Sequence, residues 1–210
     1  MVGLKLYVEG GGDSSALKTA CREGFRSFIT KAGIDSRPRI VACGSRRDAF
    51  ESFCTAVNSG QAAMLLVDSE EPVASGNAQG AAKDWRPWQH LKQRPGDNWD
   101  KPDRGDECDC HLMVPCMESW IIADPETLER FFGAGFDKNK LPKSGKIEAV
   151  QKQDIYDSLK QSSRGSRTKG EYDKGRHSFN LLACIDPTKV SAASPWARRF
   201  VDLLKSRMDP

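Results

Sequence analysis

The sequence lacks several features that would assign it to a class of protein at once. No stretch approaches the ~18 consecutive apolar residues of a membrane-spanning helix. Met1 leads into a strand-like run rather than a secretory signal, so we expect a cytoplasmic protein without a membrane partner. The charge is nearly balanced, with 32 Lys and Arg against 29 Asp and Glu, which does not by itself indicate nucleic-acid binding. The 210 residues predict a single domain, 1–210.

The chain also lacks the paired cysteine pattern of a disulfide framework. Its seven cysteines are an odd number, spread over strand-like and helix-like segments, which favours reduced thiols. One cluster, Cys108, Cys110, His111 and Cys116, contains zinc ligands, but its spacing matches no standard finger or ribbon. A strand over 109–115 would place Cys110 and His111 on opposite faces. Zinc binding by this cluster is left open.

Apolar periodicity predicts alternating strands and helices in the first 68 residues. Strands are expected over 2–8, 39–43 and 62–67, and the last is an uninterrupted apolar run, typical of a strand buried on both faces. Helices are expected from the N-cap candidates Asp13 and Ser14 to Gly33, and over 49–57. This order predicts an α/β fold with a mostly parallel sheet flanked by helices.

The rest of the chain changes in character. Residues 71–108 are rich in Pro, Gly and charged residues and predict an insertion with a short helix over 85–92, part of which packs through its tryptophans. A fourth strand is expected over 111–114. After it, one helix is expected to end at about residue 123 and a second to begin at Pro125. Two closing helices are expected over 177–185 and 196–208. The core then covers about 1–125, and a helical C-terminal extension about 126–210. The stretch 160–170, KQSSRGSRTKG, predicts an exposed loop, either a linker or a contact for a phosphate backbone.

Acidic residues follow two of the predicted strands. Glu9 follows the first strand in LYVEGGGD, and Asp68 follows the third in LLVDSEEP, with Glu70 two residues later. The carboxyl ends of parallel strands meet at one edge of a sheet, where gathered carboxylates repel one another. Mg²⁺ removes that cost, and it uses few protein carboxylates while binding substrate phosphates. The pattern predicts an Mg²⁺ or Mn²⁺ site, beside which Gly10 and Gly11 would let a phosphodiester approach.

These two motifs resemble the signature motifs of the Toprim fold, a glutamate after the first strand and a DxD-like pair after the third. Two later phrases, HLMVPCMESWIIADPETL and YDKGRHSFNLLACIDPTKV, are similar to a bacterial family of small Toprim-like proteins that includes the nuclease subunit of the PARIS phage-defence system. The resemblance covers about residues 4–204. It implies a Toprim-like, Rossmann-like fold, a metal-dependent endonuclease activity and an ABC- or AAA-type ATPase partner, with a homodimer left open.

The resemblance also implies roles for single residues. Glu9 matches the glutamate taken as general acid and base or as metal ligand, and Asp68 and Glu70 match the metal-binding pair. Glu70 stands where the common pattern has Asp, which puts direct metal binding by this residue in question. Asp13 matches a frequent acidic position, although an N-cap is its simpler role.

Other polar residues fit two roles each. Glu118 either joins the acidic edge as a metal ligand or sits in the first turn of a helix, where a carboxylate complements the dipole. Lys174 and His177 share a helix face and would hold the scissile phosphate as catalytic groups, or they are a surface lysine and a partly buried histidine. We expect further backbone contacts from Arg46, Arg47, Arg164, Arg167 and Lys169.

Three functions are compatible with these residues. The first is a nuclease that hydrolyses RNA or DNA with Mg²⁺ or Mn²⁺, restrained as a phage-defence effector by an ATPase partner. The second is a non-catalytic Toprim-fold subunit that binds a partner protein or a nucleotide. The third, a small-molecule phosphoryl enzyme, is disfavoured because the sequence has no P-loop, and because the glycines after Glu9 do not form a dinucleotide fingerprint.

Overall fold

The computed structural model describes residues 3–143 and 147–208. Its centre is a four-stranded sheet in which every neighbouring pair is parallel, in the order β2-β1-β3-β4. The strands are β1 (Lys5–Gly11), β2 (Arg39–Gly44), β3 (Ala63–Asp68) and β4 (Cys110–Met113). This confirms the predicted α/β fold with a parallel sheet, an insertion after β3 and a helical C-terminal part.

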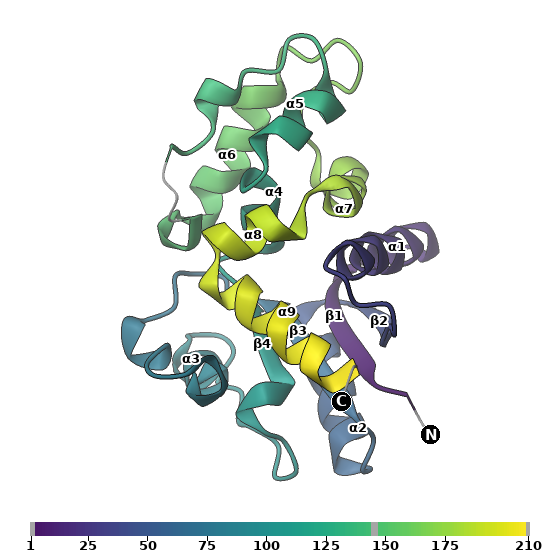
Figure 1. The fold of residues 1–210 in the computed structure, drawn as a ribbon, viewed down its shortest axis with the longest axis vertical. Helices are drawn as coiled ribbons and strands as arrows, with labels where there is room; N and C mark the ends of the chain where they lie inside the picture. Colours follow the sequence, from purple (N-terminus) through teal and green to yellow (C-terminus); the bar gives the residue numbers. More distant parts are fainter. Residues whose placement is uncertain (1–2, 144–146, 209–210) are drawn as a thin grey trace.

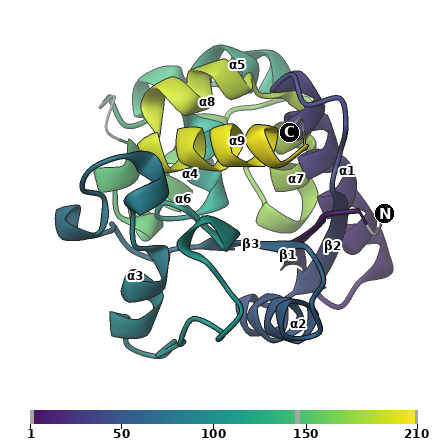
Figure 2. The same ribbon diagram turned by 60° about the horizontal axis from the view of Figure 1, so that its bottom comes forward.

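Helices cover both faces of the sheet (Figures 1 and 2). On one face, α2 (Arg46–Asn58) and α3 (Pro87–Gln93) pack on inward-facing residues such as Leu65 and Val67. On the other face, α1 (Ser15–Lys31) and the C-terminal helices pack on Leu6 and Leu66. Because alternate residues of a strand point to opposite faces, the apolar run of β3 fills two separate cores.

The C-terminal part is a layer of short helices that shares the larger core with the sheet. It consists of α4 (Met117–Ile122), α5 (Pro125–Phe132), α6 (Lys152–Ser163), α7 (Lys174–Cys184), α8 (Pro187–Ala193) and α9 (Pro195–Met208). Short 3-10 turns occur at Ser75–Asn77, Ala82–Asp84, Glu107–Asp109, Lys138–Lys140 and Ile147–Ala149. Within the described ranges, no helix combines the length and apolar character needed to cross a membrane.

The first strand differs from its predicted bounds. It was expected over 2–8, but β1 begins at Lys5 and runs to Gly11, so Glu9 lies within the strand rather than after it. Val2 lies outside the described residues. The helix that follows is capped by Ser14, whose hydroxyl accepts the Leu17 N–H at 3.4 Å, whereas Asp13 is exposed.

The stretch 160–170 is not an exposed loop throughout, which corrects the sequence prediction. Its first residues continue α6 to Ser163. The loop that follows is anchored at two points, because the hydroxyls of Ser166 and Thr168 both donate to the Phe132 carbonyl, the former at 2.6 Å and the latter at 2.8 Å. Periodicity also missed α8 entirely.

The insertion packs on the sheet through aromatic side chains, as its tryptophans predicted. Trp99 stacks on Phe50 of α2, with ring centroids 4.5 Å apart. Trp85 meets Trp196 of α9 at 4.8 Å. The buried Arg199 of α9 donates to carbonyls of the insertion, to Ala82 at 2.7 Å among others. The insertion is therefore fixed by contacts from both α2 and α9.

Candidate metal site at the carboxyl edge of the sheet

Three carboxylates converge where β1 and β3 end. Glu9, Asp68 and Glu70 each offer an oxygen, and these ligand atoms all lie within 4.8 Å of one another. The neighbouring, parallel pairing of β1 and β3 brings the first two together, and the Asp68 N–H donates to Glu9 Oε2 at 3.1 Å. The sequence prediction of one acidic edge is borne out in this placement.

Glu70 reaches the cluster by a turn and not along an extended strand. Its φ of 71° lies in the left-handed region, which a side chain other than Gly or Asn adopts only at a cost. Hydrogen bonds from Ser69 N–H to Met113 O and from Glu70 N–H to Pro115 O hold the turn, at 2.9 and 2.8 Å. Residues i and i+2 of an extended strand also share a face, but here it is the turn that brings the side chains of Asp68 and Glu70 to the same site.

Asp68 is the most enclosed of the three carboxylates. It is buried, its Oδ1 accepts the Met117 N–H at the start of α4 at 2.8 Å, and its Oδ2 accepts from Lys152 Nζ at 3.1 Å. Burial raises its pKa to about 6, against the opposing effect of Lys152. Burial, together with the charge of Asp68, raises the pKa of Glu9 to about 8. In both groups burial disfavours the ionised form, and the nearby cations offset this effect only in part.

Lys152 is a site residue that sequence reasoning missed. Besides Asp68, its ammonium contacts Glu70 Oε1 at 2.8 Å. Burial disfavours its charge, but Asp68 and Glu70 outweigh this effect and raise its pKa. Lys152 is the first residue of α6, and this polar helix was not predicted. No local motif marks the lysine, so only the tertiary structure identifies it.

Arg46 links the acidic cluster to the insertion. Its guanidinium forms a two-pronged pair with Asp97 of the insertion, at 2.6 and 2.8 Å, and it donates to the Asp68 carbonyl at 3.0 Å. It also lies 3.6 Å from Glu9 and 4.8 Å from the centre of the Trp99 ring. Arg46 therefore lies at the acidic cluster, and the backbone contact expected from it stays a prediction. Its neighbour Arg47 is exposed and pairs with Glu51 at 2.8 Å.

Glu118 lies beside the cluster in a separate network. It occupies the first turn of α4, fully buried, and accepts hydrogen bonds from the hydroxyls of Tyr156 and Tyr172, each at 3.0 Å. Lys174 Nζ lies 4.0 Å from it and donates to Tyr156 at 2.9 Å. Of the two roles considered for Glu118, the position in the first turn of a helix is observed. The carboxylate is also close enough to Asp68 to raise the pKa of that residue. Both Glu118 oxygens accept hydrogen bonds from tyrosines, and Glu118 is not a member of the cluster of Glu9, Asp68 and Glu70.

A pocket of about 190 Å³ opens beside Glu9 and Asp68. Lys174, at the start of α7, and the glycine turn Gly10–Gly12 contribute to its wall. A side chain at Gly10 would meet the Phe179 ring at 2.8 Å, and one at Gly11 would meet the Lys18 backbone at 2.7 Å. These two glycines thus permit close packing of α7 and α1, and they also line the pocket beside Glu9, where the substrate access predicted for them stays a prediction.

His177 and the basic loop lie apart from this pocket. The His177 ring packs against Phe131 and Phe132, and its Nδ1 accepts the Asp173 N–H at 3.0 Å. Burial lowers its pKa. His177 is thus a buried histidine outside the pocket, whereas Lys174 lines it.

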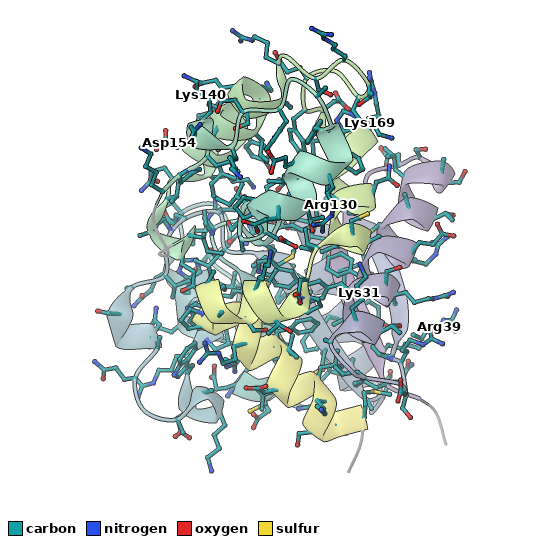
Figure 3. The ribbon with its side chains drawn as sticks, turned by 45° about the horizontal axis from the view of Figure 1, so that its top comes forward. Lys31, Arg39, Arg130, Lys140, Asp154 and Lys169 are labelled. Carbon is teal, nitrogen blue, oxygen red and sulfur yellow. The ribbon has the colours of Figure 1, made fainter. Side chains whose placement is uncertain are left out.

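The basic loop begins at the opposite end of α6 from Lys152, ~18 Å away along a helix of that length. Arg164 pairs with Glu171 at 3.2 Å, Arg167 is exposed, and Lys169 lies over the Phe131 ring, in the part of Figure 3 remote from Arg39. The structure therefore does not bring these three residues to the acidic cluster.

The four candidate zinc ligands are also dispersed. Cys110 and Cys116 belong to the two different cores, and His111 Nδ1 lies 3.2 Å from Arg199 Nη1. Among the described residues, the only cluster suited to a metal is Glu9, Asp68 and Glu70.

The chain belongs to the family described as Domain of unknown function (DUF4276), whose model matches residues 8–205. No curated protein and no solved structure matches the chain. The match spans the acidic cluster, Lys152 and Lys174, so the whole site lies within the region that defines the family.

Proposed function

We propose that this protein is a metal-dependent nuclease that hydrolyses phosphodiester bonds in RNA or DNA. The observation that carries the proposal is the meeting of Glu9, Asp68 and Glu70 within 4.8 Å at the carboxyl edge of a parallel sheet. Carboxylate oxygens are the donors that Mg²⁺ and Mn²⁺ prefer. The raised pKa values of Glu9 and Asp68 support it, because burial and neighbouring carboxylates disfavour their ionised forms, and a divalent cation would offset both effects.

The residues present fit such a cation. Glu9, Asp68 and Glu70 would hold it once the Lys152 ammonium has left the space between Asp68 and Glu70. The cation would supply Lewis-acid activation of water and charge stabilisation at the phosphate. Mg²⁺ or Mn²⁺ is therefore the cofactor we propose.

The chain's own residues would position the phosphate and handle protons. Lys174 faces the pocket next to Asp68, and a displaced Lys152 stays within reach of the same carboxylates, so two ammonium groups are available to balance phosphate charge. Glu9, with its pKa raised towards neutrality, is suited to accept a proton from the attacking water and return it. Arg46 and Asp97 fix the acidic edge from the side of the insertion.

One observation favours a second candidate, a non-catalytic subunit that binds a partner protein or nucleotide. Lys152 already provides Asp68 and Glu70 with a cationic partner at 3.1 and 2.8 Å. A site balanced in this way is stable without a metal. The two candidates therefore differ in whether a divalent cation displaces the lysine.

The biological setting is a further part of the proposal and rests on the Toprim resemblance alone. We propose a cytoplasmic bacterial phage-defence effector that an ABC- or AAA-type ATPase partner restrains. Co-expression with a candidate ABC- or AAA-type ATPase, followed by affinity purification, tests this part: a complex with lowered nuclease activity is expected, and free, fully active protein would contradict it.

The nuclease proposal is tested by cleavage of labelled tRNA, single-stranded RNA and plasmid DNA with Mg²⁺, Mn²⁺ or EDTA. Glu9→Gln and Asp68→Asn should abolish metal-dependent cleavage, while Glu129→Gln, which changes an exposed carboxylate on α5, should not. Cleavage that persists in both site variants would overturn the proposal. Folded wild-type protein that neither cleaves nor binds Mn²⁺ would favour the non-catalytic subunit.

A further inference from the structure

A groove lined by arginines runs along the edge of the sheet between α1 and β2. Its cavity measures about 450 Å³ and includes Arg22, Arg26, Arg37 and Arg39 in its wall. The strand β2 pairs only with β1 and forms one edge of the sheet, so this side of β2 has no neighbouring strand. Figure 3 shows Arg39 beside the helix α1 on this edge. We call this feature the α1–β2 groove.

The four arginines have no anionic partner among the described residues. Arg22 donates to Thr19 at 2.8 Å and Arg37 to Thr30 at 3.4 Å, and neither threonine is charged. By contrast, some exposed arginines elsewhere pair with carboxylates, as Arg47 does with Glu51 and Arg164 with Glu171. Four unpaired guanidinium groups around one cavity repel one another, and this cost is recovered when an anion binds.

The groove and the pocket of the acidic site are both bordered by α1 and by β2 or its last residue. Lys18, Arg22 and Arg26 follow one another at every fourth residue of α1, which places them in a row with a spacing of ~6 Å. Lys18 packs directly on Gly11 of the pocket wall. On the other side, Gly44 at the end of β2 lines the acidic pocket while residues 39–42 line the groove. The row of cations therefore leads from the acidic site to Arg39, ~17 Å away along the strand.

We propose that the α1–β2 groove binds the phosphate backbone of a single nucleic-acid strand, several nucleotides to one side of the bond that the acidic site cleaves. This inference rests on the proposed nuclease function. Guanidinium groups suit phosphate oxygens because they offer paired donors in a planar fork. Contacts of this kind are made with any base sequence, so the groove would fix the position of the strand without selecting its sequence.

Two other occupants fit the observations less well. An acidic peptide would satisfy the arginines, but its continuation would meet Glu9, Asp68 and Glu70, which repel it with or without Lys152. A second copy of the chain would have to bring a set of free carboxylates, and its net charge of +3 gives no such excess. A phosphodiester strand fits both the groove and the acidic site. The arginines of the groove would bind its phosphates, and a divalent cation at the acidic site would attract them as well.

The experiment measures binding of a fluorescent 20-nucleotide single-stranded RNA and its DNA counterpart by anisotropy, over a range of salt concentrations. The background is Glu9→Gln, so that the probe stays intact. The pairs Arg22→Gln/Arg26→Gln and Arg37→Gln/Arg39→Gln are compared with Arg86→Gln/Arg198→Gln, two exposed arginines outside both pockets. Thermal melting checks that each variant is folded, and Arg22→Lys/Arg26→Lys tests whether charge alone suffices.

The proposal expects each groove pair to weaken binding at least fivefold and to lower the slope of log K against log salt by ~1.4, about 0.7 for each lost phosphate contact. The control pair should change neither quantity. Three results would each overturn the proposal. They are equal losses in the groove and control pairs, unchanged binding in the groove pairs, and a wild type that binds neither probe. A different result would contradict the nuclease function alone: RNA or DNA would bind through the groove, but wild-type protein would leave it uncut in Mg²⁺ and Mn²⁺.

Discussion

The ammonium of Lys152 lies 2.8 Å from Glu70 Oε1, in the space that a divalent cation would need. Lysine and metal therefore compete for the same carboxylates. Replacing Lys152 by Met removes the competing charge and keeps most of the apolar stem. We expect Mn²⁺ to bind about tenfold more tightly, equivalent to ~1.4 kcal/mol, while cleavage falls because a phosphate-binding cation is lost. Calorimetric titration measures the affinity, and Lys160→Met, at the other end of α6, is the control. Unchanged affinity would mean that Lys152 does not occupy the metal position.

The raised pKa of Glu9 predicts how stability without metal depends on pH. A carboxyl group whose folded-state pKa is raised contributes stability at low pH that is lost as pH rises through the folded value. For Glu9 this window runs from the ordinary value of 4.5 to about 8. At pH 8 in EDTA, Glu9→Gln should therefore unfold with a free energy higher by roughly 1–3 kcal/mol. The gain should vanish at pH 4, where wild-type Glu9 is protonated, and urea titrations at both pH values measure it. A gain of equal size at both would contradict the pKa shift.

The buried Glu118 depends on its tyrosine partners. Tyr172→Phe removes one of the two hydroxyl donors while leaving the ring in place, and should lower the free energy of unfolding by ~1–3 kcal/mol. Tyr156→Phe should cost less, since this side chain is only partly buried. In a Glu118→Gln background the Tyr172→Phe effect should shrink, because the hydrogen bond then involves a neutral acceptor. Additive effects in this double-mutant cycle would show that the two groups do not interact.

The glycine turn should tolerate substitution at one position and not at another. In Gly10→Ala the new methyl group would meet the Phe179 ring at 2.8 Å, at a φ of 132°, so we expect a loss of ~2–4 kcal/mol. Gly12→Ala has open space around it and should lose only ~1–2 kcal/mol, from its left-handed backbone. Chemical unfolding of both variants measures the difference. Equal losses would show that α7 moves freely away from β1.

The strands and the acidic edge could be predicted because their signals are local. The run AMLLV of β3 is apolar throughout and ends at Asp68, so the sequence places this carboxylate at the edge of a parallel sheet. The apolar run before Glu9 places this carboxylate at the same edge, although β1 extends two residues beyond it. Neither the order of the strands nor the turn at Glu70 had a local signal, yet the adjacency of β1 and β3 decides that these carboxylates meet.

The part of the site supplied by α6 could not be predicted, because its buried face is made largely of serines. Ser158, Ser162 and Ser163 are buried, and their hydroxyls donate to helix carbonyls of the preceding turn, at 2.8, 2.7 and 2.6 Å. A serine that satisfies its hydroxyl in this way can pack in a core. Apolar periodicity does not detect such a face, so it predicts neither this helix nor the position of Lys152 at its start.

The distribution of charge along the chain has a consequence for its synthesis. Glu9, Asp68 and Glu70 leave the ribosome before Lys152 and Lys174, since the acidic ligands belong to the sheet and both lysines begin late helices. A nascent chain that ends before α6 therefore carries the carboxylates without the two ammonium groups that balance them. The carboxylates of such an incomplete chain repel one another, and the site reaches electrostatic balance only when translation is nearly finished.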